Sequence, residues 1–381
     1  MTALPSRLLR GLPPRIASLR VTVACLAILC VLTIWGTVYQ VEAGLYAAQV
    51  RFFHSWIVWL WFLPLPGTQL VLWILFFNLT ASLIFRVTWT PANVGNILTH
   101  AGLLFLLAGS WVTYQFAVES YLPLVEKEVS NASLDRRQWE IASWRKVFEQ
   151  EDRNISAADV SPDQAGTWLD FGELGFRAFV SRYHRHSDAI IGPPDPLGLP
   201  NAEGINHLKP LRPRSDPEEN LPGVVLRIQL KDGTDRELLF YGGQEKPNTF
   251  RVGGETVEIT LRRKHWPLPF AVKLLDVRRK DHPGTRTPRS YESDVEVLSD
   301  GGALPTRIFM NHPLRYRGFT LFQSGYSIDG SGQETSVFAV VENRGQMIPY
   351  VSSLLIFGGM AIHFTLMLFG VRVRKTREET P

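Results

Sequence analysis

Two histidines lie inside long apolar segments of the sequence, where an ionisable side chain is costly and therefore suggests a function. His100 follows Asn93 and Asn96 at helical spacing, so the three would form one polar stripe, and His363 lies in the last apolar segment. Gly102 and Gly109, one heptad apart, would let another helix approach closely. Imidazole binds haem iron and transition metals, and it also relays protons. The alternative for both residues is a neutral histidine that is hydrogen-bonded to a neighbouring helix. Both histidines are therefore candidate ligands.

Other chemistry-bearing motifs in the sequence are weaker. His184 and His186 would lie on one strand face as a possible metal pair, but two histidines alone are a weak signal, and two exposed polar residues are the favoured interpretation. Cys25 and Cys30 both lie in the first apolar segment, which excludes a disulfide framework and zinc-type spacings. The sequence lacks Cys-x-x-Cys-His, Gly-x-Ser-x-Gly, a phosphate loop and His-Glu-x-x-His. Covalent attachment of haem to this chain in the manner of a c-type cytochrome and the usual hydrolase chemistries are therefore excluded.

Four apolar segments are long enough to cross a membrane as helices, namely residues 21–38, 70–86, 97–116 and 349–370. Arginines and lysines cluster in residues 1–20, at Arg86 and in residues 371–381, all on one side of the predicted bilayer. Because such residues mark the cytoplasmic side, both termini are expected in the cytoplasm. We therefore expect a multi-pass protein of the bacterial inner membrane, with residues 39–69 and 117–346 on the periplasmic side.

The outer loop at residues 39–69 is rich in aromatic residues. Residues 51–62 include Trp56, Trp59 and Trp61, and the run ends at Pro64 and Pro66. Such a segment predicts an amphipathic helix on the membrane surface, with tryptophan rings at headgroup depth. The alternative is one wall of an outward-facing ligand pocket.

Residues 117–346 predict a large, antiparallel β-rich domain, either a sandwich or a barrel-like fold. Short apolar runs such as 224–230 and 256–261 alternate with polar residues and are separated by glycine-containing turns. Residues 135–151 are the exception, for which we expect a helix. The net charge is +4, and the basic residues form no stripe interleaved with aromatics. Nucleic acid is therefore not expected as a partner.

Several segments of this domain resemble the ResB-like family, also called CcsB. They are residues 268–274, 282–285 and 288–295, and above all residues 310–324, which read Met-Asn-His-Pro-Leu-Arg-Tyr-Arg-Gly-Phe-Thr-Leu-Phe-Gln-Ser. Three spans, a large outer domain and a fourth span are also the family's layout. The resemblance implies the ResB component of System II cytochrome c maturation. That component is not an enzyme by itself but a subunit of a haem-attachment complex.

The resemblance also implies partners and a ligand. In this family, a CcsA-type membrane protein with a tryptophan-rich motif is thought to help carry haem b outward and deliver it to apocytochrome c. His100 matches the family's third-span histidine, a proposed ligand of the haem iron in transit. His363 has no equally firm counterpart. The chain lacks a tryptophan-rich motif of the partner's kind, so a separate partner is expected beside membrane lipid and apocytochrome c.

Two arginines of the most specific segment, Arg315 and Arg317, could pair with haem propionates, because guanidinium recognises carboxylates bidentately. The alternative is a turn and strand that stabilise the sheet. A second function remains open, in which the protein is a scaffold that docks apocytochrome and stabilises its partner without binding haem. A third, a membrane redox enzyme, is disfavoured because no cysteine lies outside the first apolar segment.

Overall fold

The computed structural model describes residues 16–147, 150–151, 155–192, 201–285, 287–328, 330 and 332–369. The basic end segments that we predicted to be cytoplasmic fall mostly in residues 1–15 and 370–381, outside the described residues. The chain divides into two compact units, one formed by Met1–Ala117 with Asn343–Pro381 and the other by Val118–Glu342.

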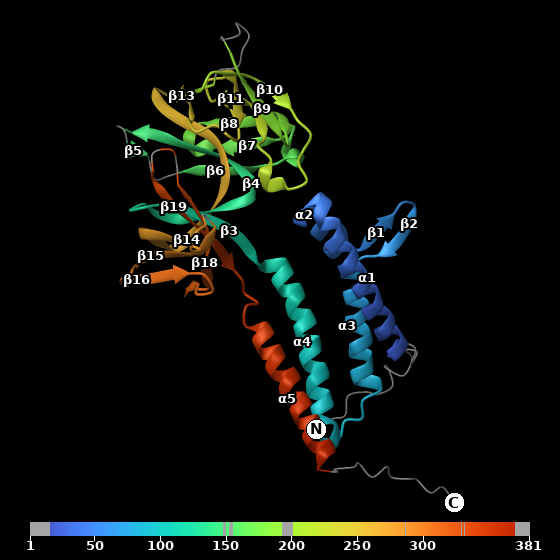
Figure 1. The fold of residues 1–381 in the computed structure, drawn as a ribbon. Helices are drawn as coiled ribbons and strands as arrows, with labels where there is room; N and C mark the ends of the chain where they lie inside the picture. The colour runs from blue at the N-terminus through green and yellow to red at the C-terminus, as the bar shows by residue number, and fades with distance from the viewer. Residues whose placement is uncertain are drawn as a thin grey trace, which may run out of the picture. The chain divides into compact units, whose positions relative to one another are not determined.

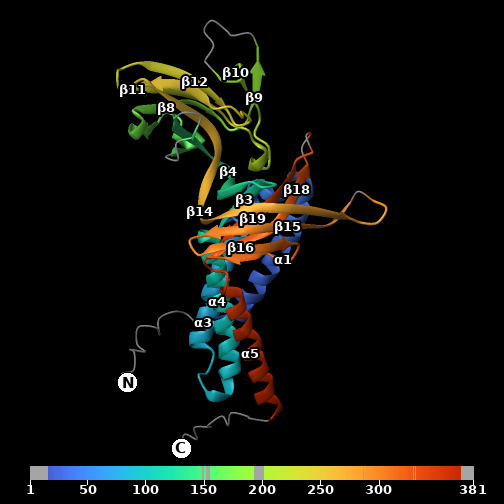
Figure 2. The ribbon, with the colours of Figure 1, turned by 90° about the vertical axis from the view of Figure 1, so that its left-hand side faces the viewer.

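The first unit contains four long apolar helices, as the hydropathy predicted. They are α1 (Leu19–Ala43), α3 (Thr68–Phe85), α4 (Val94–Phe116) and α5 (Ile348–Leu368), and each is long and apolar enough to cross a membrane. Shorter pieces connect them: α2 (Leu45–Ala48), the π-helix η1 (Gln49–Phe53) and the 3₁₀-helix η2 (Pro91–Asn93). Figures 1 and 2 both show α4 and α5 side by side.

The ends of these helices follow from local sequence. The Ser18 hydroxyl accepts a hydrogen bond from the backbone N–H of Arg20, and Gly44 ends α1 at a φ of 85°. Pro91 begins the 3₁₀ turn before α4, and Pro349 lies in the first turn of α5. Both prolines are at positions where a helix needs no backbone N–H.

The membrane-surface helix that we predicted for the aromatic loop is wrong for most of its length. Helical structure ends at Phe53, and an antiparallel hairpin follows, formed by β1 (Ile57–Leu60) and β2 (Leu63–Pro66). Pro64 and Pro66 account for the absence of helix over residues 63–66, because proline disfavours helix at its own position and at the residue before it.

The second unit is β-rich, and all its strand pairs are antiparallel, as predicted. A four-stranded sheet has the order β12-β11-β8-β7, β9 pairs with β10, and the remaining strands belong to one long sheet. The strands are β3 (Val118–Val125), β4 (Val129–Val147), β5 (Gln150–Glu151), β6 (Ser156–Val160), β7 (Trp168–Phe171), β8 (Phe176–His184), β9 (Ser187–Ile191), β10 (Ile205–Pro210), β11 (Gly223–Leu230), β12 (Asp235–Tyr241), β13 (Asn248–Val252), β14 (Glu255–Asp281), β15 (Pro288–Ser299), β16 (Gly302–Phe309), β17 (Leu314–Tyr316), β18 (Phe319–Ile328) and β19 (Glu334–Glu342).

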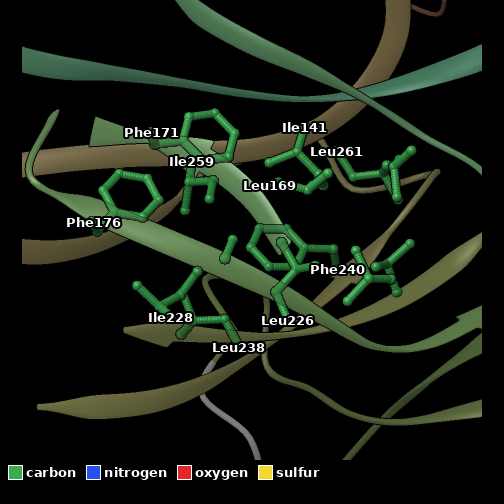
Figure 3. Close-up of a cluster of buried hydrophobic side chains, with 14 of the residues drawn as sticks. Ile141, Leu169, Phe171, Phe176, Leu226, Ile228, Leu238, Phe240, Ile259 and Leu261 are labelled. Atoms are coloured by element: carbon green, nitrogen blue, oxygen red, sulfur yellow. The ribbon is translucent and has the colours of Figure 1, made fainter. Parts of the chain in front are cut away.

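This unit has two hydrophobic cores. The first core belongs to a part that we call the central lobe, because it lies in the middle of the sequence. This core lies between the four-stranded sheet and parts of β4, β13 and β14, and Phe171, Phe176 and Phe240 are among its side chains (Figure 3). The helix-linked lobe has a core formed by β3 and β14 to β19. Its strands β3 and β19 directly follow α4 and precede α5. The long strands β4 and β14 contribute to both lobes.

The helix that we predicted over residues 135–151 is also wrong, because β4 extends to Val147. Residues 139–144 are all buried, on both faces of the strand. Their sequence therefore lacks the alternation of apolar and polar residues that marks a half-buried strand. Glu140 is accommodated there by an ion pair with Arg262 of β14, at 2.8 Å.

Candidate functional site

His100 lies on α4, and its imidazole is half-buried. Its Nδ1 lies 2.9 Å from the backbone oxygen of Asn96, one helical turn earlier. Because a carbonyl oxygen can only accept, this bond requires the proton to be on Nδ1. In the neutral imidazole Nε2 then carries the lone pair, and no residue in the described ranges hydrogen-bonds to it. A backbone carbonyl bound to one imidazole nitrogen is the usual support for a histidine that binds metal through the other.

The opposite side of α4 is occupied by α5. Gly95, Gly102 and Gly109 are spaced one heptad apart and are all buried. A Cβ added at Gly95 would lie 2.6 Å from the carbonyl oxygen of Gly359, and one at Gly102 would lie 3.0 Å from the backbone nitrogen of Ile356. The close helix approach predicted from Gly102 and Gly109 is therefore confirmed, and Gly95 extends it by one heptad.

This packing determines the direction of His100. His100 is five residues from Gly95, which is about 140° around a helix, so its side chain points away from α5. Trp111 is eleven residues further on and lies only about 20° from His100 around the helix. Its ring meets that of Trp73 on α3, with centroids 6.2 Å apart. His100 therefore lies on the side of α4 that faces α3.

The polar stripe that we predicted along α4 is divided between two local interactions. Asn93 donates from its amide to the carbonyl oxygen of Thr88, at 3.0 Å, and thereby fixes the turn before the helix. Asn96 contributes its backbone oxygen to His100. Of these three residues, only His100 has a nitrogen that can ligate a metal, because a side-chain amide nitrogen is a hydrogen-bond donor.

His363 does not join His100. The backbone of His363 faces Gly95, whereas its imidazole is exposed and meets the ring of Phe364 at 5.6 Å. His100 is five residues beyond Gly95, about 7.5 Å along the helix, and it points to the other side. The two histidines that stood out in the sequence therefore do not form one binding site within this chain.

Arg315 and Arg317 lie in and after β17, in the helix-linked lobe. Arg317 has a φ of 48°, and its Nη1 donates to the carbonyl oxygen of Pro269 at 3.0 Å. Arg315 is exposed and lies opposite Thr320 of β18. His312 stacks on Phe309 with ring centroids 4.1 Å apart and helps to close the preceding turn. Arg317 thus stabilises the turn, and Arg315 is the arginine with an open side chain.

The pair His184 and His186 is not a metal site. The Nδ1 of the buried His186 accepts the backbone N–H of Leu221, at 3.2 Å. Burial lowers the pKa of His184, and the charges of Arg182 and His207 lower it further. Across the part of the chain that the structure describes, no group of three or more histidine, cysteine, aspartate or glutamate side chains could hold a metal ion.

Sequence reasoning missed an ionic cluster that joins three strands of the helix-linked lobe. Arg278 of β14 donates to Glu292 at 2.9 Å and to Asp294 at 2.7 Å, and both carboxylates belong to β15. Arg307 of β16 donates to Asp294 at 2.6 Å. The hydrogen bond from Arg307, together with that from Arg278, lowers the pKa of Asp294 against the effect of partial burial. This cluster fixes the register of strands within the segment that carries the family resemblance.

Comparisons with known proteins find similarity in this same part of the chain. Residues 237–347 match the ResB-like family, from β12 through β19. Protein NrfI of Wolinella succinogenes is 32% identical over 106 residues, which cover 27% of this chain and 11% of that protein. The chain thus matches about a tenth of the length of this relative. The resemblance to the ResB-like family is confirmed on this segment, whereas His100 lies outside it.

Proposed function

We propose that this chain acts in cytochrome c biogenesis as the ResB-type component of System II. The similarity of residues 237–347 to the ResB-like family supports this role. Four apolar helices support a location in the membrane. In this proposal the membrane is the bacterial inner membrane, both termini are cytoplasmic, and the β-rich unit is periplasmic.

The observation that carries the proposed chemistry is the geometry of His100. Its Nδ1 hydrogen bond to Asn96 leaves Nε2 as the nitrogen that can ligate iron. The substrate is haem b, which enters this site, is held through its iron by His100 and an imidazole from a CcsA-type partner, and is passed outward. The β-rich unit then lies on the side where apocytochrome c receives the haem.

The outer arginines have a secondary part in this proposal. Arg315 is exposed, so its guanidinium is open to a haem propionate. Arg317 already donates to Pro269, so its main part is to stabilise the turn. His363 is exposed on α5 and is separated from the His100 side of α4, so it is a ligand only through contacts with another chain.

The test is an absorption spectrum of the chain purified in detergent with its CcsA-type partner. Wild type is compared with His100→Gly, each with and without added imidazole, and His363→Gly is the matched control. We expect the haem Soret band to be lost in His100→Gly and restored by imidazole, while His363→Gly keeps it. An unchanged spectrum in His100→Gly would remove this residue from the role of ligand. The absence of haem from every preparation, together with normal cytochrome c maturation by His100→Gly, would instead establish the scaffold function.

A further inference from the structure

The hairpin β1–β2 has no polar face. All ten residues from Ile57 to Pro66 are apolar, and the sequence holds no aspartate, glutamate, lysine or arginine between Arg51 and Arg86. Trp59 is 57% exposed, Trp61 is 90% exposed and Phe62 is 84% exposed. A strand pair in water normally covers one apolar face and presents polar residues on the other. This hairpin presents apolar side chains on both faces, so its sequence does not fit an aqueous environment.

The backbone of the hairpin is also adapted to apolar surroundings. Pro64 pairs with Trp59, and Pro66 pairs with Ile57. Proline has no N–H to exchange, so these pairs are the ones whose backbone groups point outward from the hairpin. The prolines thus remove two N–H donors from the open edge of β2. On the other edge, Arg51 donates to the outward carbonyl oxygen of Trp59, at 3.4 Å.

The base of the hairpin is fixed against the helix pair α1–α3. Val58 is buried in the cluster that contains Leu32 of α1 and Val71 of α3. The backbone N–H of Gly67 donates to the carbonyl oxygen of Trp56 at 2.8 Å, and a Cβ on Gly67 would lie 2.8 Å from the carbonyl carbon of Ser55. The hairpin is therefore held where α1 ends and α3 begins, as Figure 1 shows.

We propose that this hairpin is a membrane anchor, which inserts Trp61 and Phe62 into the headgroup–acyl boundary of the leaflet that receives the end of α1 and the start of α3. Two features of the hairpin favour a lipid surface. Its side chains are apolar, and the indole N–H groups of Trp56, Trp59 and Trp61 require polar partners. The headgroup–acyl boundary offers an apolar and a polar environment at one depth. Arg51, at the base of the hairpin, lies on aromatic rings of Tyr39 and Phe52, with its guanidinium carbon 4.9 Å and 5.6 Å from their centroids. Such a position suits the phosphate level of the bilayer.

The backbone at the tip supports an exposed function for Trp61. Trp61 adopts a φ of 55°, which is rare and strained for a bulky residue. Asparagine or glycine would satisfy the turn without that strain. An exposed tryptophan at this position contributes nothing to packing within the chain, so its ring is available to contact an external surface. This inference holds whether or not the chain handles haem.

The test measures the depth of a nitroxide spin label in the full-length protein. Cys25 and Cys30 are first replaced by alanine, and a single cysteine is introduced as Trp61→Cys or, as a second site without the strained backbone, Phe62→Cys. Lys231→Cys, in an exposed turn of the β-rich unit, is the control. The labelled proteins are reconstituted in nanodiscs of phosphatidylethanolamine and phosphatidylglycerol. Collision rates are then measured with oxygen, which partitions into lipid, and with a water-soluble nickel chelate.

We expect oxygen to dominate at both hairpin sites and the nickel chelate to dominate at the control. Nickel-dominated relaxation at sites 61 and 62 would place the tip in water and overturn the proposal. Low collision rates with both reagents would overturn it in another way, because the tip would then be covered by protein, either a second copy or a partner chain.

Discussion

Helices α4 and α5 pack through glycines, whereas α1 and α3 pack through larger side chains and one buried amide. Gly95 and Gly359 leave room for backbone to approach backbone, with a Cβ on Gly359 only 2.7 Å from the carbonyl oxygen of Gly95. Between α1 and α3 the buried groups include Cys25, Leu32 and Asn78.

The polar contact between α1 and α3 is concentrated on Asn78. Its side-chain oxygen accepts from the hydroxyl of Thr22 at 2.6 Å, and its nitrogen donates to the carbonyl oxygens of Ser18, at 3.2 Å, and of Ile16. Arg86 adds a bond to the carbonyl oxygen of Ala17, at 2.8 Å. The chain before α1 is thus tied to α3 by directed bonds.

The two helix pairs should therefore respond differently to substitutions. In lipid, apolar side chains gain little by burial against each other, so close packing and interhelical hydrogen bonds decide association. The α4–α5 pair depends on shape and fails when volume is added. The α1–α3 pair depends on partners and fails when a hydrogen bond is removed. His100 belongs to the first pair, which is also the pair that leads directly into β3 and out of β19.

The largest effect is expected from Gly95→Leu. The new side chain would collide with the backbone of α5 at Gly359 and His363, so the helices must separate. We expect the free energy of unfolding to fall by about 3 kcal/mol, at the upper end of the usual cost of overpacking. The measurement is a titration with sodium dodecyl sulfate in mixed micelles, followed by tryptophan fluorescence.

Gly358→Leu is the matched control on α5, because a Cβ at that position would have no atom within 4 Å apart from its chain neighbours and the local backbone of its own helix. Its free energy of unfolding should stay close to that of the wild type. Equal losses in both variants would show that leucine harms these helices without regard to the contact, and the shape-dependent account of the α4–α5 pair would fail.

A smaller effect is expected from Asn78→Leu. The substitution removes the bonds of Asn78 to the Thr22 hydroxyl and to the carbonyl oxygens of Ile16 and Ser18, of which Ser18 keeps its bonds to the backbone of α1. The expected cost is about 1–2 kcal/mol in the same titration. Thr80→Val is its control, because the Thr80 hydroxyl bonds only within its own helix, to the carbonyl oxygen of Phe76. If Thr80→Val proved as destabilising as Asn78→Leu, the buried amide would have no special part in joining α1 to α3.

The helices and one of their contacts were predictable from the sequence because lipid imposes a simple rule on composition. A segment that spans must satisfy its backbone internally and present apolar side chains, so hydropathy alone locates α1, α3, α4 and α5. The spacing of Gly102 and Gly109 indicated a close approach. Gly95 was missed because it precedes the predicted start of the span at residue 97.

The β-rich unit was predictable in class but not in detail. Residues 139–144 of β4 are buried on both faces of the strand, and the charge of Glu140 is paired with Arg262, far along the chain. The hairpin β1–β2 has apolar residues on both faces and therefore lacks alternation as well. For β4 the sequence pattern follows from packing that only the folded structure reveals, and for the hairpin it follows from the lipid contact proposed above.

The candidate site was predictable in one residue and not in its environment. His100 stood out because an ionisable side chain in an apolar segment is costly. Its hydrogen bond to the backbone of Asn96 could not be read from residue types, because every residue has a carbonyl. The direction of the His100 side chain, away from α5, depends on which face of α4 carries the glycines that contact α5. That face is known only from the packing of two helices that are distant in sequence.

The smallest effect tests whether the Asn78 contact acts as a unit. Thr22→Val removes one hydroxyl, whose bond to Asn78 is 2.6 Å long, and should cost about 0.6 kcal/mol, the average for an interhelical hydrogen bond in a membrane. In the double variant with Asn78→Leu, the loss of Thr22 should add almost nothing, because its partner is already absent. Combined with Gly95→Leu, the same Thr22→Val should cost its full value. Additivity between Thr22→Val and Asn78→Leu would mean that the Asn78 contact does not act as a unit. Coupling between Thr22→Val and Gly95→Leu would mean that the two helix pairs are not stabilised separately.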